Sequence, residues 1–318
     1  MLIIIFDTRT AVLSAQEGVA LCVRTVVPSL FPFFVLSGVI NSCLIGQKFT
    51  LLQPLGRLTK IPKGTESLVV LGFLAGYPVG AQLITQAYID GNLKKDTARR
   101  MLGFCNNAGP AFLFGMVSPL FSSRKIILIL WGIHILSALI AGYILPSKRT
   151  EPTKITSCPG ISFSQSLQKA IKAICSVCGW IIMFRVVFGF LNRWFLWLLP
   201  VAAQALIGGL LELSNGCIML QSISGEGLRF LLAGTMLSFG GLCVSMQTIS
   251  VTEGLGTGWY FLGKLLQTTL VILFSLLLQP VLFSVSERFS LSAPAVLILI
   301  CFLCLLVFLL FRKKLWHF

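Results

Sequence analysis

The chain has 318 residues, of which 56% are apolar and only 11% charged, and its mean hydropathy is +0.92. A soluble domain carries about 25% charged residues, so this composition excludes an ordinary soluble protein. The net charge of +15 comes from basic residues in the loops between apolar runs rather than from one basic face. This distribution is a topology signal with attraction to anionic headgroups, so we expect the lipid bilayer as a partner and no nucleic acid polymer.

The apolar runs at 126–145, 265–283 and 293–311 are long and continuous. Strands of a membrane barrel would instead alternate apolar and polar residues. A helix satisfies its own backbone hydrogen bonds inside lipid. The sequence therefore predicts an all-α polytopic membrane protein.

The first predicted half of the fold covers 1–145. Residues 7–24 mix charges with apolar positions, which is typical of an interfacial amphipathic helix. A first full span follows at 26–45, and the half ends with an ordinary span at 126–145. Residues 1–6 are too short to span a membrane, and we interpret them as the end of a longer upstream helix.

The apolar segment 64–90 is interrupted at its centre by 76–80. Each arm has about eleven residues, or about 16 Å of helix, which reaches only halfway through a core of about 30 Å. The pattern predicts a re-entrant helical hairpin, whose backbone groups at the tip must be buried in protein or line a polar cavity. The alternative is a tight structural turn packed against its neighbours. The candidate substrate or ion-binding residues at this tip are Gly76, Tyr77, Pro78 and Gly80.

A crossing helix is predicted at 101–121, with a break before Pro110, which withholds a backbone donor. Asn106, Asn107 and Gly109 beside this break are further candidate binding residues. The amides suit hydroxyl or amide groups of a solute, or the coordination shell of Na⁺. The alternative is that they cap the broken helix, and the two roles are compatible.

The same order of elements returns after a predicted cytoplasmic linker at 146–162. The second half, 163–284, contains an interfacial helix at 163–173, a span at 174–191, a hairpin at 201–223, a broken helix at 228–250 and a span at 265–283. An extra C-terminal membrane helix is predicted at 293–311.

Each half thus contains a span, a hairpin that returns, a broken crossing and a span. That gives three crossings, an odd number, so the second half must lie upside down relative to the first. Inverted repeats with discontinuous helices at matching positions indicate a secondary transporter that binds its substrate near the membrane midplane.

The candidate binding residues of the second half surround its hairpin tip and its helix break: Glu212, Ser214, Asn215, Gly240, Gly241, Ser245 and Gln247. An intramembrane carboxylate is costly and marks function by default. Glu212 would bind substrate hydroxyls, carry a coupling proton or pair with Arg185, and the sequence leaves these alternatives open. For the glycines the alternative is close helix packing, and for Ser245 and Gln247 it is interhelical hydrogen bonding. We interpret His134 as a packed core histidine without an obvious partner.

Charge predicts the orientation. One side, which includes the loops at 46–64, 89–100, 146–172 and 251–264 and the tail after 311, carries 17 of the 25 Lys and Arg residues. The heavier side is cytoplasmic, so we expect the N-terminus outside and the C-terminus inside.

Two CxxC spacings, at 175–178 and 301–304, fall in apolar segments without histidine or acidic neighbours. Free cysteine is a common small buried residue. We therefore expect no metal site and no cofactor, apart from Na⁺ or H⁺ as a coupling ion.

Five segments resemble the sporulation integral membrane protein YlbJ family, within the wider nucleoside-recognition or gate domain group. They are VPSLFPFF at 27–34, LGFLAGYPVGA at 71–81, FCNNAGPAFLFG at 104–115, GLLELSNG at 209–216 and SFGGLCVSMQ at 238–247. The resemblance implies a bacterial inner-membrane protein linked to spore cortex formation. It also implies a distant likeness to concentrative nucleoside transporters, whose two hairpins and two broken helices hold substrate and a coupling cation. It does not identify the transported species.

The leading hypothesis is a multi-pass transporter of a small polar solute, nucleoside-like or an envelope precursor, driven by Na⁺ or H⁺. One alternative is a non-transporting membrane scaffold or gate module in sporulation. Another is a membrane-embedded enzyme acting on a lipid-linked substrate, but no nucleophile stands beside a base and two histidines are few for acid–base chemistry. We therefore expect no enzyme. The sequence leaves homo-oligomerisation open.

Overall fold

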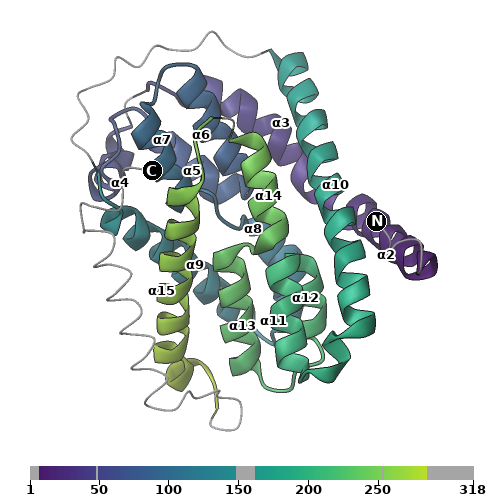
Figure 1. Ribbon diagram of the computed structural model, residues 1–318. Helices are drawn as coiled ribbons and strands as arrows, with labels where there is room; N and C mark the ends of the chain where they lie inside the picture. The colour runs from purple at the N-terminus through teal and green to yellow at the C-terminus, as the bar shows by residue number, and fades with distance from the viewer. Residues whose placement is uncertain (1–6, 48, 148–161, 253, 285–318) are drawn as a thin grey trace.

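The structure is a computed structural model and describes residues 7–47, 49–147, 162–252 and 254–284. In these residues the regular structure is helical throughout (Figure 1). Five of the helical segments there are long and apolar enough to cross a membrane: Thr8–Ile40, Arg124–Ile144, Phe163–Trp194, Glu226–Val251 and Gly258–Leu282. The predicted all-α membrane fold is confirmed. The extra helix at 293–311 and most of the linker at 146–162 lie outside the described residues.

The first helix differs from the prediction. Helix α2 (Thr8–Leu21) continues through a π-helical turn (Cys22–Val26) into α3 (Val27–Leu44), so 7–24 is not a separate interfacial helix. Its two acidic side chains are paired instead, because α2 packs along α10 (Phe163–Trp194). Asp7 and Glu17 form ion pairs with Arg193 and Arg185 of α10, at 3.0 and 2.9 Å. Likewise 163–173 is the first part of α10 and not a helix of its own.

Each half contains the expected pair of short helices. In the first, α5 (Glu66–Ala75) and α6 (Val79–Ile89) pack on each other across the turn at 76–78. In the second, α11 (Val201–Leu211) and α12 (Leu213–Leu220) pack on each other across Glu212. Helices of this length extend about 12–17 Å. In Figure 1 the first pair lies toward one end of the molecule and the second pair toward the other.

Both predicted helix breaks are present. Helix α7 (Lys95–Cys105) ends before a non-helical stretch at 106–109, after which α8 (Pro110–Phe112) continues into a π-helical turn (Leu113–Val117) and a 3-10 turn (Ser118–Leu120). Helix α13 (Glu226–Phe239) is separated from α14 (Gly241–Val251) by Gly240, which adopts a left-handed conformation. The first crossing begins at Lys95 rather than at 101, because its charged first turn is already helical.

The remaining elements are α4 (Gln53–Thr59), α9 (Arg124–Ile144), α15 (Gly258–Leu282) and 3-10 turns at Thr50–Leu52 and Leu196–Leu198. Elements at equivalent places in the two halves touch each other: α3 packs on α10, and α9 packs on α15. Helix α15 also packs against α7 and α13, and α14 packs against α6. The hairpins and broken helices are therefore enclosed between the long helices.

Candidate functional site

The tip of the second hairpin is organised by a buried carboxylate. Glu212 is 4% exposed, and its two carboxylate oxygens accept hydrogen bonds from the backbone N–H groups of Ser214 and Asn215, both at 3.1 Å. Its extended backbone ends α11 and starts α12, so Glu212 is the N-cap of α12. The carboxylate also faces the positive end of the helix dipole, which stabilises its charge.

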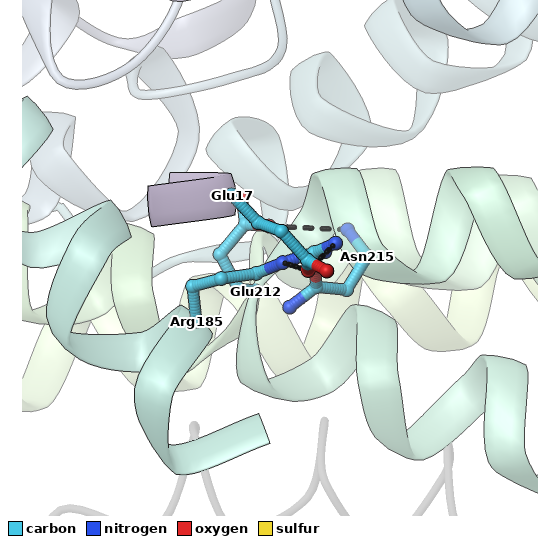
Figure 2. Close-up of polar contacts among 4 residues, drawn as sticks. All are labelled: Glu17, Arg185, Glu212 and Asn215. Carbon is cyan, nitrogen blue, oxygen red and sulfur yellow. Dashed lines mark hydrogen bonds and ion pairs between the residues drawn. The ribbon is translucent and has the colours of Figure 1, made fainter. Parts of the chain in front are cut away.

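Arg185 is engaged elsewhere. Its guanidinium donates to Glu17, with Nε and Nη2 at 3.2 and 2.9 Å from the carboxylate oxygen. Figure 2 shows the Arg185–Glu17 contact separately from the contact between Glu212 and Asn215. The expected alternative, a Glu212–Arg185 ion pair, is therefore not formed, because Glu17 of α2 takes the arginine.

The tip of the first hairpin interlocks with the break of the first crossing helix. Gly76 has a φ of +81°, and a Cβ there would lie 2.8 Å from the backbone nitrogen of Gly109. A Cβ on Gly80 would meet the carbonyl of Cys105 and lie 3.2 Å from the Cα of Asn106. Only glycine allows the two backbones to approach this closely. Three predicted site residues therefore have a packing role here.

The second half repeats this contact. Gly241 has a φ of +75°, and a Cβ there would lie 2.8 Å from the carbonyl oxygen of Gly209 in α11. Ser245 donates to the Gly241 carbonyl at 2.9 Å, one turn back along its own helix. Gly240, with a φ of +85°, provides the left-handed residue between α13 and α14.

A cavity of about 50 Å³ lies where the two tips meet. A buried water needs about 10–15 Å³ of such space, so the cavity has room for a few waters or a small ion. A drug-sized solute needs a pocket of several hundred Å³, so this space is too small for such a solute in the described conformation. The predicted site residues that line it are Gly76, Tyr77, Gly109, Glu212, Ser214 and Gln247. Apolar side chains complete the wall: Val26, Leu30, Ala75, Ala111, Phe112, Val177, Ile181, Leu213 and Val244.

The other predicted site residues lie around this cavity without lining it: Pro78, Gly80, Asn106, Asn107, Asn215, Gly240, Gly241 and Ser245. Asn215 is 1% exposed, and its side-chain amide makes no hydrogen bond within the described part of the chain. The Oδ1 atom of Asn106 is also buried without such a partner. Buried polar atoms of this kind call for a water, an ion or a ligand.

The two asparagines of the first break join the halves. Asn106 Nδ2 donates to Thr248 Oγ1 of α14 at 2.8 Å. Asn107 Nδ2 donates to the Phe104 carbonyl at 2.6 Å, which caps the end of α7 as the alternative interpretation expected. On its other side, Asn107 Oδ1 accepts from Lys264 Nζ of α15 at 3.0 Å.

Sequence reasoning missed two members of this network. Lys264 was assigned to a cytoplasmic loop, but it is 1% exposed and lies within α15. His134 was expected to have no partner, whereas its Nε2 accepts the Ala108 backbone N–H at 3.3 Å, inside the helix break. The available signal was polar spacing, because Tyr260, Gly263, Lys264 and Gln267 recur on one face of an apolar helix.

A larger groove of about 440 Å³ lies at one end of the molecule between α3, α6, α10 and α14. Polar side chains from all four helices line it: Ser37, Gln82, Thr85, Gln86, Ser166, Lys169, Lys172, Ser176 and Ser250. Lys169 Nζ donates to Gln86 Oε1 at 3.2 Å across it. The linings of this groove and of the small cavity meet at the adjacent residues Ser176 and Val177 on α10, and they lie three residues apart on α14, at Ser250 and Gln247.

A stretch of 137 residues is 28% identical to the sporulation integral membrane protein YlbJ of Bacillus subtilis (strain 168). The match covers 42% of this chain and 34% of that protein, so it spans about a third of the relative's length. This confirms the predicted resemblance. No family model and no solved structure matches. The chain is therefore a multi-pass integral membrane protein related to a bacterial sporulation membrane protein.

Proposed function

We propose that this protein transports a small polar solute, and that the cavity between the two hairpin tips is its binding site. The observation that carries the proposal is the convergence of both tips and the first helix break on one cavity that includes a buried carboxylate. A buried, capped carboxylate at a helix break is suited to bind solute hydroxyls or a coupling ion. In this proposal the protein is not an enzyme.

The proposal includes a membrane arrangement. The two hairpins are re-entrant, and the two halves are inverted repeats like those of concentrative nucleoside transporters. Several features support this. The hairpin arms are half the length of a span, the order of elements repeats, and equivalent long helices of the two halves pack on each other. The hairpins also lie toward opposite ends of the molecule (Figure 1), as inversion requires.

The groove between α3, α6, α10 and α14 supplies the access route. It shares α3, α10 and α14 with the small cavity, and the two linings reach adjacent residues on α10 and residues three apart on α14. The basic loops at this end of the molecule support a cytoplasmic location for it. In this proposal the groove opens toward the cytoplasm, and movement of one half against the other would join groove and cavity.

The solute is nucleoside-like or an envelope precursor, Na⁺ or H⁺ is the coupling ion, and the role is in spore cortex formation. The name of the relative supports a sporulation role. A non-transporting scaffold is the second candidate, and it would need no buried carboxylate at a hairpin tip. Substitution of Glu212 therefore distinguishes the transporter from the scaffold.

The test is a thermal-unfolding screen of the purified full-length protein against nucleosides, sugars and amino acids, with and without Na⁺. Ligand at about 100 times its Kd stabilises by about 2.7 kcal/mol, which raises the unfolding midpoint by several degrees. We expect one solute class to stabilise the wild type and not Glu212→Gln.

Glu226→Gln is the matched control. Glu226 is also a buried carboxylate that accepts from backbone and hydroxyl donors, at Ser122, but it lies away from the cavity. This variant should respond to the solute like the wild type. If no solute class stabilises the wild type, or if Glu212→Gln responds fully, the proposed site is wrong.

A further inference from the structure

The network behind the first helix break contains an unneutralised buried cation. The Lys264 ammonium donates to the amide oxygens of Asn107 and Gln267, both at 3.0 Å. Gln267 is itself held by its own donation to the His134 carbonyl at 3.2 Å. Lys264 belongs to α15 in the second half and Asn107 to the break in the first half, so the cation lies at the contact between the halves.

The charge of Lys264 has no carboxylate partner within 4 Å in the described part of the chain, where the ion pairs are those of α2 with α10. A buried charge of this kind is costly unless oxygen dipoles surround it. Neutral side-chain amide oxygens converging on one point are also the kind of hard ligand that a small metal cation takes.

The titratable groups on the elements packed against α15 do not supply a counter-charge. Helix α7 presents Cys105, and α9 presents His134, whose Nε2 carries no proton where it accepts from Ala108. On α13 both charged residues are engaged with the segment around Ser122: Glu226 accepts from Ser122, and Arg229 donates to the Leu120 carbonyl at 2.6 Å.

Arg100 provides a contrast within the same molecule. It is also a buried cation, but its guanidinium donates to four backbone carbonyls at the ends of α4 and α9: Thr59, Lys60, Gly142 and Leu145. These donors fix one geometry between neighbouring elements of one half. Lys264 instead bridges two side-chain amides, one on its own helix and one in the break of the other half, so its contact crosses the boundary at which the halves would move.

We propose that the Lys264 ammonium takes the place of a bound Na⁺ at the contact between the halves, so that the coupling ion is the proton carried on Nζ. This inference rests on the proposed transport function and names its coupling ion. When the halves separate, one N–H bond of the ammonium breaks, the electron pair stays on Nζ, and the proton passes to a water molecule that reaches the network. Reprotonation from the other side of the membrane restores the ammonium.

The test uses the purified full-length protein without any solute. Its unfolding midpoint is compared in NaCl and in choline chloride at equal ionic strength. We expect no difference for the wild type near neutral pH, because the site already holds its cation. In Lys264→Met and Lys264→Gln the vacated site should admit Na⁺, so NaCl should raise the midpoint by about 3 °C or more over choline chloride.

Two controls make the result specific. Lys264→Arg keeps a cation in place, so its unfolding midpoint should not respond to Na⁺. The midpoint of Lys169→Met, in the groove between α3, α6, α10 and α14, should not respond either. If the neutral variants do not fold, the wild type at about pH 11.5, roughly one unit above the ordinary lysine pKa of about 10.4, replaces them, because loss of the proton removes the charge and leaves the side chain. A sodium-dependent rise is expected there.

The proposal is overturned if Na⁺ stabilises the wild type near neutral pH. It is equally overturned if the unfolding midpoint of the folded neutral variants, or of the wild type at about pH 11.5, does not respond to Na⁺. Since no solute is present, these outcomes concern Lys264 alone. Failure of the proposed transport function would appear separately, in the solute screen with Glu212→Gln.

Discussion

The two hairpin tips share an architecture and differ in chemistry. The first tip is made by backbone: Gly76 in a left-handed conformation and a cis Tyr77–Pro78 peptide, pressed against Gly109. The second tip is made by a side chain, because the Glu212 carboxylate caps α12. One half therefore supplies shape to the shared cavity and the other supplies charge. A solute bound between them would be fitted by the first tip and held by the second.

The comparison requires that the two hairpin tips approach the shared cavity from opposite faces of the membrane. In a background without native cysteines, we expect cysteines at Thr50 and Gly91, which flank the first hairpin, to react with a membrane-impermeant maleimide from the cytoplasmic side. Cysteines at Leu198 and Gln221, which flank the second, should react only from outside. All four of these positions are exposed. If Gly91 and Thr50 label from opposite sides, the first hairpin is a full span and the inverted arrangement is wrong.

The first tip, which is formed by backbone contacts, should tolerate substitution less well than the second. Gly76→Ala adds a Cβ 2.8 Å from the Gly109 nitrogen at a positive φ. We expect a loss of about 2–4 kcal/mol of stability, from the left-handed strain and the overpacking together. Unfolding midpoints measured in detergent check this.

Gly91→Ala is the matched control for that prediction. Its φ of +76° is nearly the same, but nothing lies within 4 Å of the added Cβ. We expect it to lose only the strain, about 1–2 kcal/mol. Equal losses in the two variants would mean that the contact between the tip and the helix break contributes nothing.

At the second tip, substitutions of Glu212 should affect stability and solute binding to different extents. Glu212→Ala removes the cap of α12 and should lower stability by about 0.5–2 kcal/mol. Glu212→Gln keeps one acceptor oxygen and should lose less, but both variants should lose the response to the solute that stabilises the wild type. An unfolding midpoint unchanged in Glu212→Ala would show that the carboxylate is not the cap.

Much of this architecture could be predicted because its signals are local. Pro110 and Gly240 mark the two helix breaks, and the half-length apolar arms mark the hairpins, since each depends on backbone properties of a few neighbouring residues. Of the glycines predicted for the candidate site, Gly76 and Gly109 line one cavity together with Glu212.

What the sequence could not supply were contacts between distant helices. The charges of 7–24 are typical of an interfacial helix, and only the position of Arg185 and Arg193 on α10 shows that Glu17 and Asp7 are paired. A lysine at the edge of an apolar run is typical of a loop, and only the packing of α15 between α7, α9 and α13 shows that Lys264 is buried. Arg100 was counted among the loop charges for the same reason. Two of the 17 basic residues that the sequence assigns to the cytoplasmic side, Arg100 and Lys264, are therefore buried.

The smallest expected effect concerns the choice between Glu17 and Glu212 as the partner of Arg185. Arg185 contacts Glu17 at 2.9 Å, but the Glu17 side chain is 63% exposed, so the coupling energy should be below about 1 kcal/mol. Double-mutant cycles of unfolding free energy measure it. Arg185→Leu with Glu17→Leu should show this coupling, whereas Arg185→Leu with Glu212→Leu should be additive. Rescue of Arg185→Leu by Glu212→Leu would instead make the buried carboxylate a structural partner of the arginine. The charge at the second tip would then be neutralised within the protein, and the contrast between the two tips would lose its functional meaning.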